Sequence, residues 1–161
     1  GVGMIPENIY ALVEKRLKER WTAIPKAEKA LEKAREKAAA MGSSQTSSGG
    51  SKTKSAGSRV ERMAILIVTA EKALETAQKW DDVFRKLDAI FPENTSEGFV
   101  ASLMYGNGMS QEDVCRFTHC ARVTVRRRRD RYVNYAAMLA ATMGLIKTEE
   151  VKSDGGTDPE E

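Results

Sequence analysis

Apolar residues recur at helical spacing through the first half of the chain. From Ile9 to Met41, a stretch rich in Ala, Glu and Lys, apolar positions alternate steps of three and four along one side. They are Ile24, Ala27, Leu31, Ala34, Ala38 and Met41. Pro25 interrupts the pattern, so we expect a kink or a new helix start there. The helical period returns from Arg59 to Phe91, after Ser58 as a candidate cap.

The segment between these two helices has no periodicity. Residues 42–58 read GSSQTSSGGSKTKSAGS, a composition that cannot bury a core and that predicts a flexible loop. Two long helices joined by such a loop most simply form an antiparallel hairpin, with coiled-coil character along the seam. Neither helix can bury its apolar side alone, so each needs the other or a second subunit. We therefore predict a helical hairpin over residues 4–91, and a homodimer through it is an open alternative.

A second helical domain is predicted over residues 94–146. Pro92 ends the preceding helix, and caps at 94–96 introduce a short helix that ends before the turn at 106–108. Beyond this domain, residues 147–161 carry two lysines and six acidic residues, which predicts an acidic disordered tail. The predicted fold class is all-α, a long antiparallel hairpin followed by a helix-turn-helix domain.

Two consecutive helices are expected within SQEDVCRFTHCARVTVRRRRDRY, residues 110–132. Ser110 is a strong N-cap with acidic residues in the turn that follows it. The helix from Gln111 should bury Val114 and Cys115, with Phe117 as a third candidate, and should end near Thr118. After a tight turn, a basic helix is expected from about residue 121 to about residue 143.

Charge is unevenly spread, although the whole chain carries only +3. Between residues 110 and 135, seven arginines face three acidic residues, a net charge of +4, and the acidic tail follows. A basic block of this kind indicates a nucleic-acid partner, here double-stranded DNA.

The helical phase assigns roles within the basic helix. Val125 must face the preceding helix, and Tyr132 falls on the same side. Three arginines flank this buried stripe, namely Arg122, Arg128 and Arg129. The opposite side or its edges carry Val123, Arg126, Arg127, Asp130 and Arg131. An arginine fork can bind guanine O6 and N7 together, and Thr124 with the backbone amides at Ser110 and Gln111 suits phosphate. The candidate DNA-binding residues are Ser110, Gln111, Arg122, Val123, Thr124, Arg126, Arg127 and Arg131.

This segment resembles the helix-turn-helix of the promoter-reading C-terminal domain of sigma factors. The whole layout is similar to small phage and prophage regulators of the RinA/ArpU type, which join a helical hairpin with a Gly/Ser-rich insert to a sigma-like helix-turn-helix. The resemblance covers roughly residues 9–139, and in the first half it is one of pattern more than identity. It implies sequence-specific control of phage late or packaging genes. The chain departs from the sigma pattern at His119, where Gly is usual, and at Val123, where a polar residue is usual.

Metal binding and catalysis fit the sequence less well than DNA binding. Cys115, His119 and Cys120 offer only three candidate metal ligands, two of them adjacent, so we expect buried thiols and no metal site or cofactor. No paired carboxylates or nucleophile–base set points to an enzyme.

Two alternatives stay open. One is a DNA-packaging protein similar to a phage small terminase subunit, which would assemble into rings, and the other is an interaction module contacting RNA polymerase.

The longest apolar run, Ala64 to Val68, is far too short to cross a membrane, so a cytoplasmic protein of a bacterial host is expected.

Overall fold

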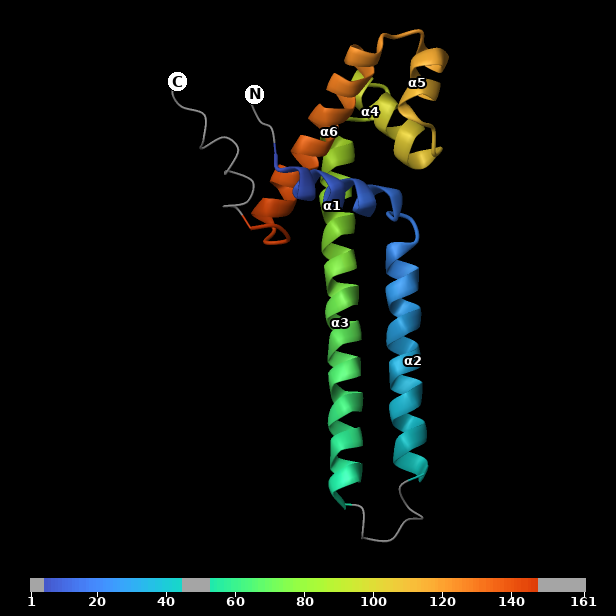
Figure 1. Cartoon of the computed structure of the whole chain (residues 1–161), viewed down its shortest axis with the longest axis vertical. Helices are drawn as coiled ribbons and strands as arrows, with labels where there is room; N and C mark the ends of the chain where they lie inside the picture. Colours follow the sequence, from blue (N-terminus) through green and yellow to red (C-terminus); the bar gives the residue numbers. More distant parts are fainter. Residues whose placement is uncertain (1–4, 45–52, 148–161) are drawn as a thin grey trace. The chain divides into compact units, whose positions relative to one another are not determined.

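The structure, a computed structural model, describes residues 5–44 and 53–147, without the side chains of 42–44 and 53–57. The described residues are all-helical, as predicted, and include no strand. In chain order (Figure 1) the elements are α1 (Glu7–Lys18), α2 (Ala23–Ser44), α3 (Thr53–Ile90), α4 (Ser96–Ala101), the π-helical turn η3 (Ser102–Gly106), α5 (Gln111–Thr118) and α6 (Arg122–Thr142). No helix among the described residues is both long and apolar enough to span a membrane.

The break predicted at Pro25 is confirmed, but the new helix begins two residues earlier, at Ala23. Pro25 lies in the first turn of α2, where a backbone N–H has no partner within the helix, so the ring costs no hydrogen bond. The turn is closed by the Lys26 N–H, which donates to the Thr22 carbonyl oxygen at 3.0 Å.

The flexible loop predicted over residues 42–58 is shorter in the structure. Helix α2 continues to Ser44 and α3 already begins at Thr53, so Ser58 lies inside a helix and does not cap one. Adding residues to an existing helix costs far less than starting a new one, which explains this extension into Gly- and Ser-containing sequence. The rest of the predicted loop, 45–52, lies outside the described residues, as does the predicted tail from 148 onward.

The chain divides into two compact units, and the division differs from the boundary expected between residues 91 and 94. One unit comprises residues 1–21 and 79–161, and the other comprises residues 22–78. Helix α3 belongs to the second unit as far as Gln78 and to the first from Lys79. A helix can pass from one core to the next without a break, so the proline at 92 marks the end of α3 and not a domain boundary.

The second unit is formed by α2 and the first part of α3, which lie side by side (Figure 1). Leu31 and Ala34 of α2 are buried, and all six predicted seam positions from Ile24 to Met41 are at least partly buried. Arg35 and Glu71 form an exposed ion pair between the helices at 3.5 Å. The seam predicted along α2 is thus confirmed.

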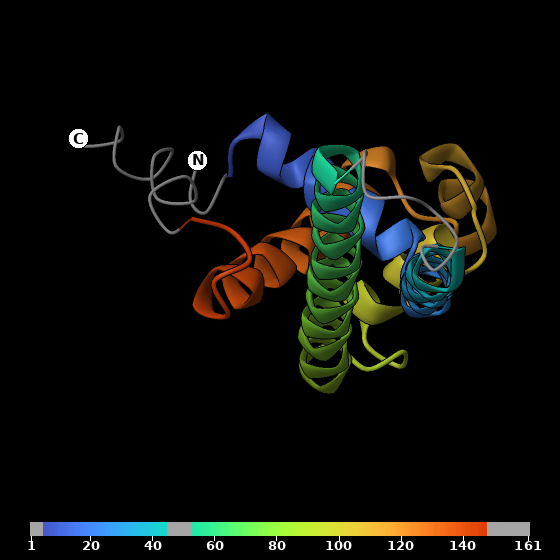
Figure 2. The ribbon, with the colours of Figure 1, turned by 90° about the horizontal axis from the view of Figure 1, so that it is seen from below.

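The first unit has its main core where α1, the last turns of α3 and α6 meet, with α1 crossing α6 (Figures 1 and 2). Its fully buried side chains include Val13 of α1, Phe84 and Leu87 of α3, and Val133 of α6. A smaller cluster of Val100, Leu103, Val114 and Val125 joins α4, η3, α5 and α6. The basic helix is therefore held by α1 and α3 as well as by the helices next to it in sequence.

Candidate nucleic-acid interface

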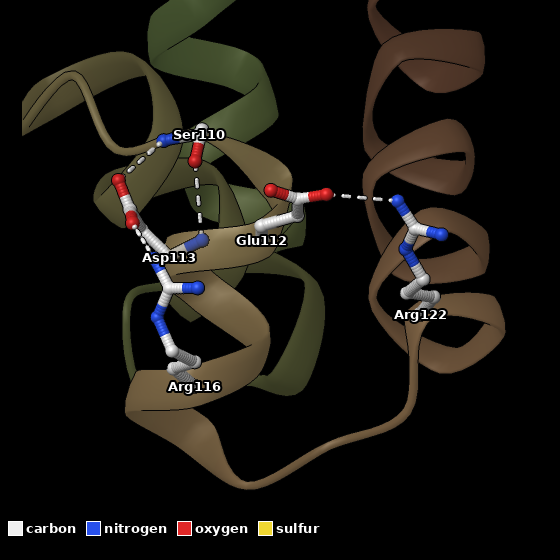
Figure 3. Close-up of polar contacts among 5 residues, drawn as sticks. All are labelled: Ser110, Glu112, Asp113, Arg116 and Arg122. Atoms are coloured by element: carbon white, nitrogen blue, oxygen red, sulfur yellow. Dashed lines mark hydrogen bonds and ion pairs between the residues drawn. The ribbon is translucent and has the colours of Figure 1, made fainter.

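Helix α5 begins with a capping box (Figure 3), which bears out the N-cap predicted at Ser110. The Asp113 N–H donates to Ser110 Oγ at 3.1 Å, and the Ser110 N–H donates to Asp113 Oδ2 at 3.4 Å. Arg116 holds the other Asp113 oxygen at 2.6 Å. The hydrogen bonds from the Ser110 side chain and backbone, with a smaller effect of Arg116, lower the pKa of Asp113.

This capping box corrects one part of the sequence interpretation. The sequence predicts that the Ser110 backbone amide binds phosphate, but in the structure it donates to the chain's own Asp113 carboxylate. A phosphate would have to displace that carboxylate. Gln111, the other predicted amide donor, is the first residue of α5 and is partly exposed.

The connection between α5 and α6 turns at His119. Its backbone is left-handed, with a φ of 58°, and no other non-glycine residue among those described has a positive φ. The Cys120 N–H donates to the Cys115 carbonyl oxygen at 3.2 Å, and Thr118 Oγ1 donates to the Val114 carbonyl oxygen at 2.7 Å. The Cys120–Cys115 backbone bond closes the helix end as a Schellman-type cap, for which glycine is the usual left-handed residue, and here histidine takes that place.

Val114 and Val125 are both fully buried and fix the phase of the two helices against each other. Tyr132 is buried as well, as predicted from its spacing to Val125. Cys115 and Cys120 are half-buried free thiols that pack against the same cluster. Among the described residues, no group of three His, Cys, Asp or Glu side chains is placed to hold a metal ion.

With that phase fixed, the beginning of α6 exposes four of the predicted residues on its surface. These are Arg122, Val123, Arg126 and Arg127, and Val123 is 51% exposed. Arg122 pairs with Glu112 of α5 at 3.0 Å (Figure 3), and both side chains are exposed. Thr124, also predicted to contact DNA, is partly exposed. An exposed ion pair of this kind contributes little to stability, so Arg122 can exchange Glu112 for a phosphate at low cost.

Arg131 lies more than two turns beyond Arg122 on α6 and makes more contacts within the protein. It approaches Glu97 of α4 at 3.6 Å and lies over the rings of Phe91 and Tyr135, at 5.8 and 5.7 Å from their centroids. Its side chain is still 58% exposed, so it can reach an anion without leaving these rings.

Arg128 and Arg129 flank the buried stripe, as the helical phase predicted, and are partly buried. Arg128 Nη1 lies 3.7 Å from Cys120 Sγ, beside the turn. Arg129 pairs with Asp130 at 3.2 Å and lies over the ring of Tyr10 at 5.6 Å, with its side chain only 19% exposed. These two arginines therefore belong to the packing of the domain more than to its surface.

Helix α1 supports the basic helix through a polar network that the sequence interpretation does not contain. Tyr10 Oη donates to Asp130 Oδ1 at 2.5 Å, and Tyr105 Oη donates to Glu14 Oε2 at 2.7 Å. Burial, followed by the hydrogen bond to the carboxylate, raises the pKa of each tyrosine, so both hydroxyls remain protonated donors at neutral pH. No local pattern in the sequence signals this network, because its two hydrogen bonds join residues 120 and 91 positions apart.

Phe117 is not buried as the helical pattern allowed, but is 60% exposed. Its ring centroid lies 6.4 Å from that of Phe99, which is 40% exposed on α4. Val114 occupies the inner side of α5, and the eight-residue helix ends one residue after Phe117, which leaves this ring at the edge of the small core.

No protein-family model, characterised protein or solved structure matches this chain significantly, so its likeness to the sigma factors and phage regulators rests on the sequence pattern alone.

Proposed function

We propose that this protein is a sequence-specific DNA-binding regulator in which α5 and α6 act as a helix-turn-helix. The observation that carries the proposal is the phase of α6. Burial of Val125 and Tyr132 turns Arg126 and Arg127 outward, and Arg122 is exposed as the first residue of the helix. In this motif the second helix enters the major groove and its early residues reach the base edges.

The exposed side of α6 carries groups that can bind base edges and groups that can bind phosphates, and DNA recognition needs both. Arg126 and Arg127 can bind guanine edges, and the exposed Val123 can contact a thymine methyl group. Arg122 and Arg131 already hold carboxylates, the exposed Glu112 and the partly buried Glu97, at distances that a phosphate oxygen would also satisfy. We therefore assign Arg122 and Arg131 to the phosphates of the DNA backbone. Arg126, Arg127 and Val123 are assigned to the base edges.

The resemblance to RinA/ArpU-type regulators supports a role in the control of phage or prophage late or packaging genes. We also propose RNA polymerase as a second partner, bound through the helical hairpin. Both remain proposals that rest on the sequence pattern, whereas the DNA-binding proposal also rests on the geometry of α6.

The test is selection of bound sequences from random DNA, followed by affinity measurement on the selected site and on a scrambled duplex. The proposal expects a preferred site and a loss of preference in Arg126→Ala or Arg127→Ala. Arg85→Ala is the matched control, because Arg85 is 75% exposed but lies on α3, paired with Asp81. Absence of any preferred site, or equal losses in the control, would refute the proposal.

A further inference from the structure

The first half of α3 carries more apolar surface than α2 can cover. Residues 64–70 read AILIVTA, seven positions without a charge, and are apolar around the whole helix. Ile67 and Ala70 are partly buried on the seam with α2, yet Ile65 is 64% exposed and Val68 is 48% exposed. A helix that is apolar on all sides is normally buried on all sides.

Ile65 and Val68 belong to a stripe with coiled-coil spacing. Together with Glu61 and Lys72 they follow steps of four, three and four, which places all four on one side of the helix. All four side chains are exposed. We call Glu61, Ile65, Val68 and Lys72 the α3 stripe.

The α3 stripe is complementary to itself when it is reversed. In an antiparallel pair centred between Ile65 and Val68, each Ile65 lies opposite the Val68 of the other copy. Each Glu61 then lies opposite a Lys72, at both ends. A parallel pair would instead place Glu61 against Glu61 and Lys72 against Lys72, and like charges directly opposed are unfavourable.

We propose that the α3 stripe is a homodimer interface in which two copies of this chain pair antiparallel through α3. Two-fold symmetry requires one surface to complement itself, and the α3 stripe does so in both apolar and charged positions. An unrelated partner would need no such internal symmetry. The proposal concerns the second unit alone and does not depend on the proposed DNA binding.

The first test uses the full chain without DNA, with its mass measured by sedimentation at increasing concentration. The wild type is expected to dimerise below about 100 μM. Glu61→Lys and Lys72→Glu should each weaken the dimer at least about tenfold, because each creates two like-charge contacts in a symmetric pair. The double variant E61K/K72E reverses both charges and should restore dimerisation.

Apolar variants provide an independent check. Ile65→Lys should yield a monomer with unchanged helix content by circular dichroism. Met138→Lys is the matched control, because Met138 is 54% exposed on α6, in the other unit, and should leave the dimer intact. A monomeric wild type, single charge variants that dimerise normally, or a failure of E61K/K72E to recover would each overturn the proposal. A ring of many subunits would also overturn it and would favour the packaging alternative.

Cross-linking tests the antiparallel direction. Glu61→Cys mixed with Lys72→Cys should form a mixed disulfide under mild oxidation, because those positions face each other and the opposite Glu61–Lys72 pair remains intact. Glu61→Cys alone should not cross-link to itself, since its two copies would be about 16 Å apart along the axis at 1.5 Å per residue. Efficient self-cross-linking of Glu61→Cys, without the mixed product, would mean parallel pairing and would overturn the proposal.

Discussion

Tyr10 of α1 donates a 2.5 Å hydrogen bond to Asp130 of α6, a residue 120 positions further along the chain. Asp130 also pairs with Arg129, whose guanidinium lies over the Tyr10 ring. The N-terminal helix thus contacts the proposed DNA-reading helix directly, at a residue one turn beyond Arg126 and Arg127. Changes in α1 should therefore reach DNA binding, although α1 contributes none of the proposed DNA contacts.

A fragment of residues 94–147, which the sequence boundary would make an independent domain, is expected to be unfolded. It lacks Val13 of α1 and Phe84 and Leu87 of α3, all fully buried, so the inner side of α6 would face water. Circular dichroism of the fragment checks this.

The matched control is a chain in which a short Gly/Ser linker joins residues 1–21 to residues 79–161. This chain keeps the whole first unit, and closing a flexible linker of about ten residues costs little free energy. It should fold cooperatively. A helical, cooperatively melting 94–147 fragment would contradict the shared core.

Leu17→Ala should destabilise the protein by about 2–5 kcal/mol, because Leu17 is 3% exposed in the main core and its loss leaves a cavity. Lys18→Ala, an exposed change on the same helix, should stay within about 0.5 kcal/mol of the wild type. Urea unfolding of both variants measures the difference. Equal stabilities would mean that α1 is not packed as described.

The sequence predicts well what neighbouring residues decide. The N-cap at Ser110, the bounds of α5 and the burial of Val125 all follow from residues within one or two turns of each other. What the sequence does not predict depends on distant partners. The contact of Tyr10 with Asp130 has no local signature, and for that reason the sequence pattern places α1 in the hairpin and not in the unit of the basic helix.

Within the candidate interface too, features set by neighbouring residues can be predicted from the sequence, and features set by distant partners cannot. The outward phase of Arg126 and Arg127 can be counted from Val125, whereas the engagement of Arg131 by Glu97 and Phe91 cannot. Phe117 departs from its prediction because helical periodicity shows which side of α5 a residue occupies but not how far the small core extends.

Stability should depend on Asp113 in a pH-dependent way. Its pKa is lowered in the folded protein, so its ionised form contributes stability that is complete above the ordinary value of 3.8 and is lost as the pH falls through the lower folded value. Asp113→Asn should therefore be less stable than the wild type at pH 7, and the gap should close in strong acid. Thermal melts from pH 7 to pH 2 check this.

A double-mutant cycle with Ser110 separates the capping box from other effects of Asp113. Ser110→Ala should cost about 1 kcal/mol through the lost cap, and in that background Asp113→Asn should have a smaller effect. Additive losses, or a gap between wild type and Asp113→Asn that persists at pH 2, would contradict the coupling.

The arginines of α6 should separate into three classes by their surroundings. Arg127→Ala, at an exposed early position, should cost about 1–3 kcal/mol on the selected DNA site and flatten the preference at one base pair. Arg131→Ala should weaken all sequences alike and reduce the salt slope by about one, because Arg131 is assigned to phosphate. Binding to selected and scrambled duplexes over a range of salt distinguishes the two.

Arg129→Ala belongs to the third class and should lower stability more than sequence preference. Its side chain is mostly buried, pairs with Asp130 and covers Tyr10, so its removal takes the charged partner from Asp130 and exposes the Tyr10 ring at the α1 contact. Urea unfolding should show the loss, while the ratio of affinities for selected and scrambled DNA stays near that of the wild type. If Arg127, Arg129 and Arg131 variants instead lose affinity equally without a change in preference, the arginines form only an electrostatic patch. In that case α6 does not read the major groove.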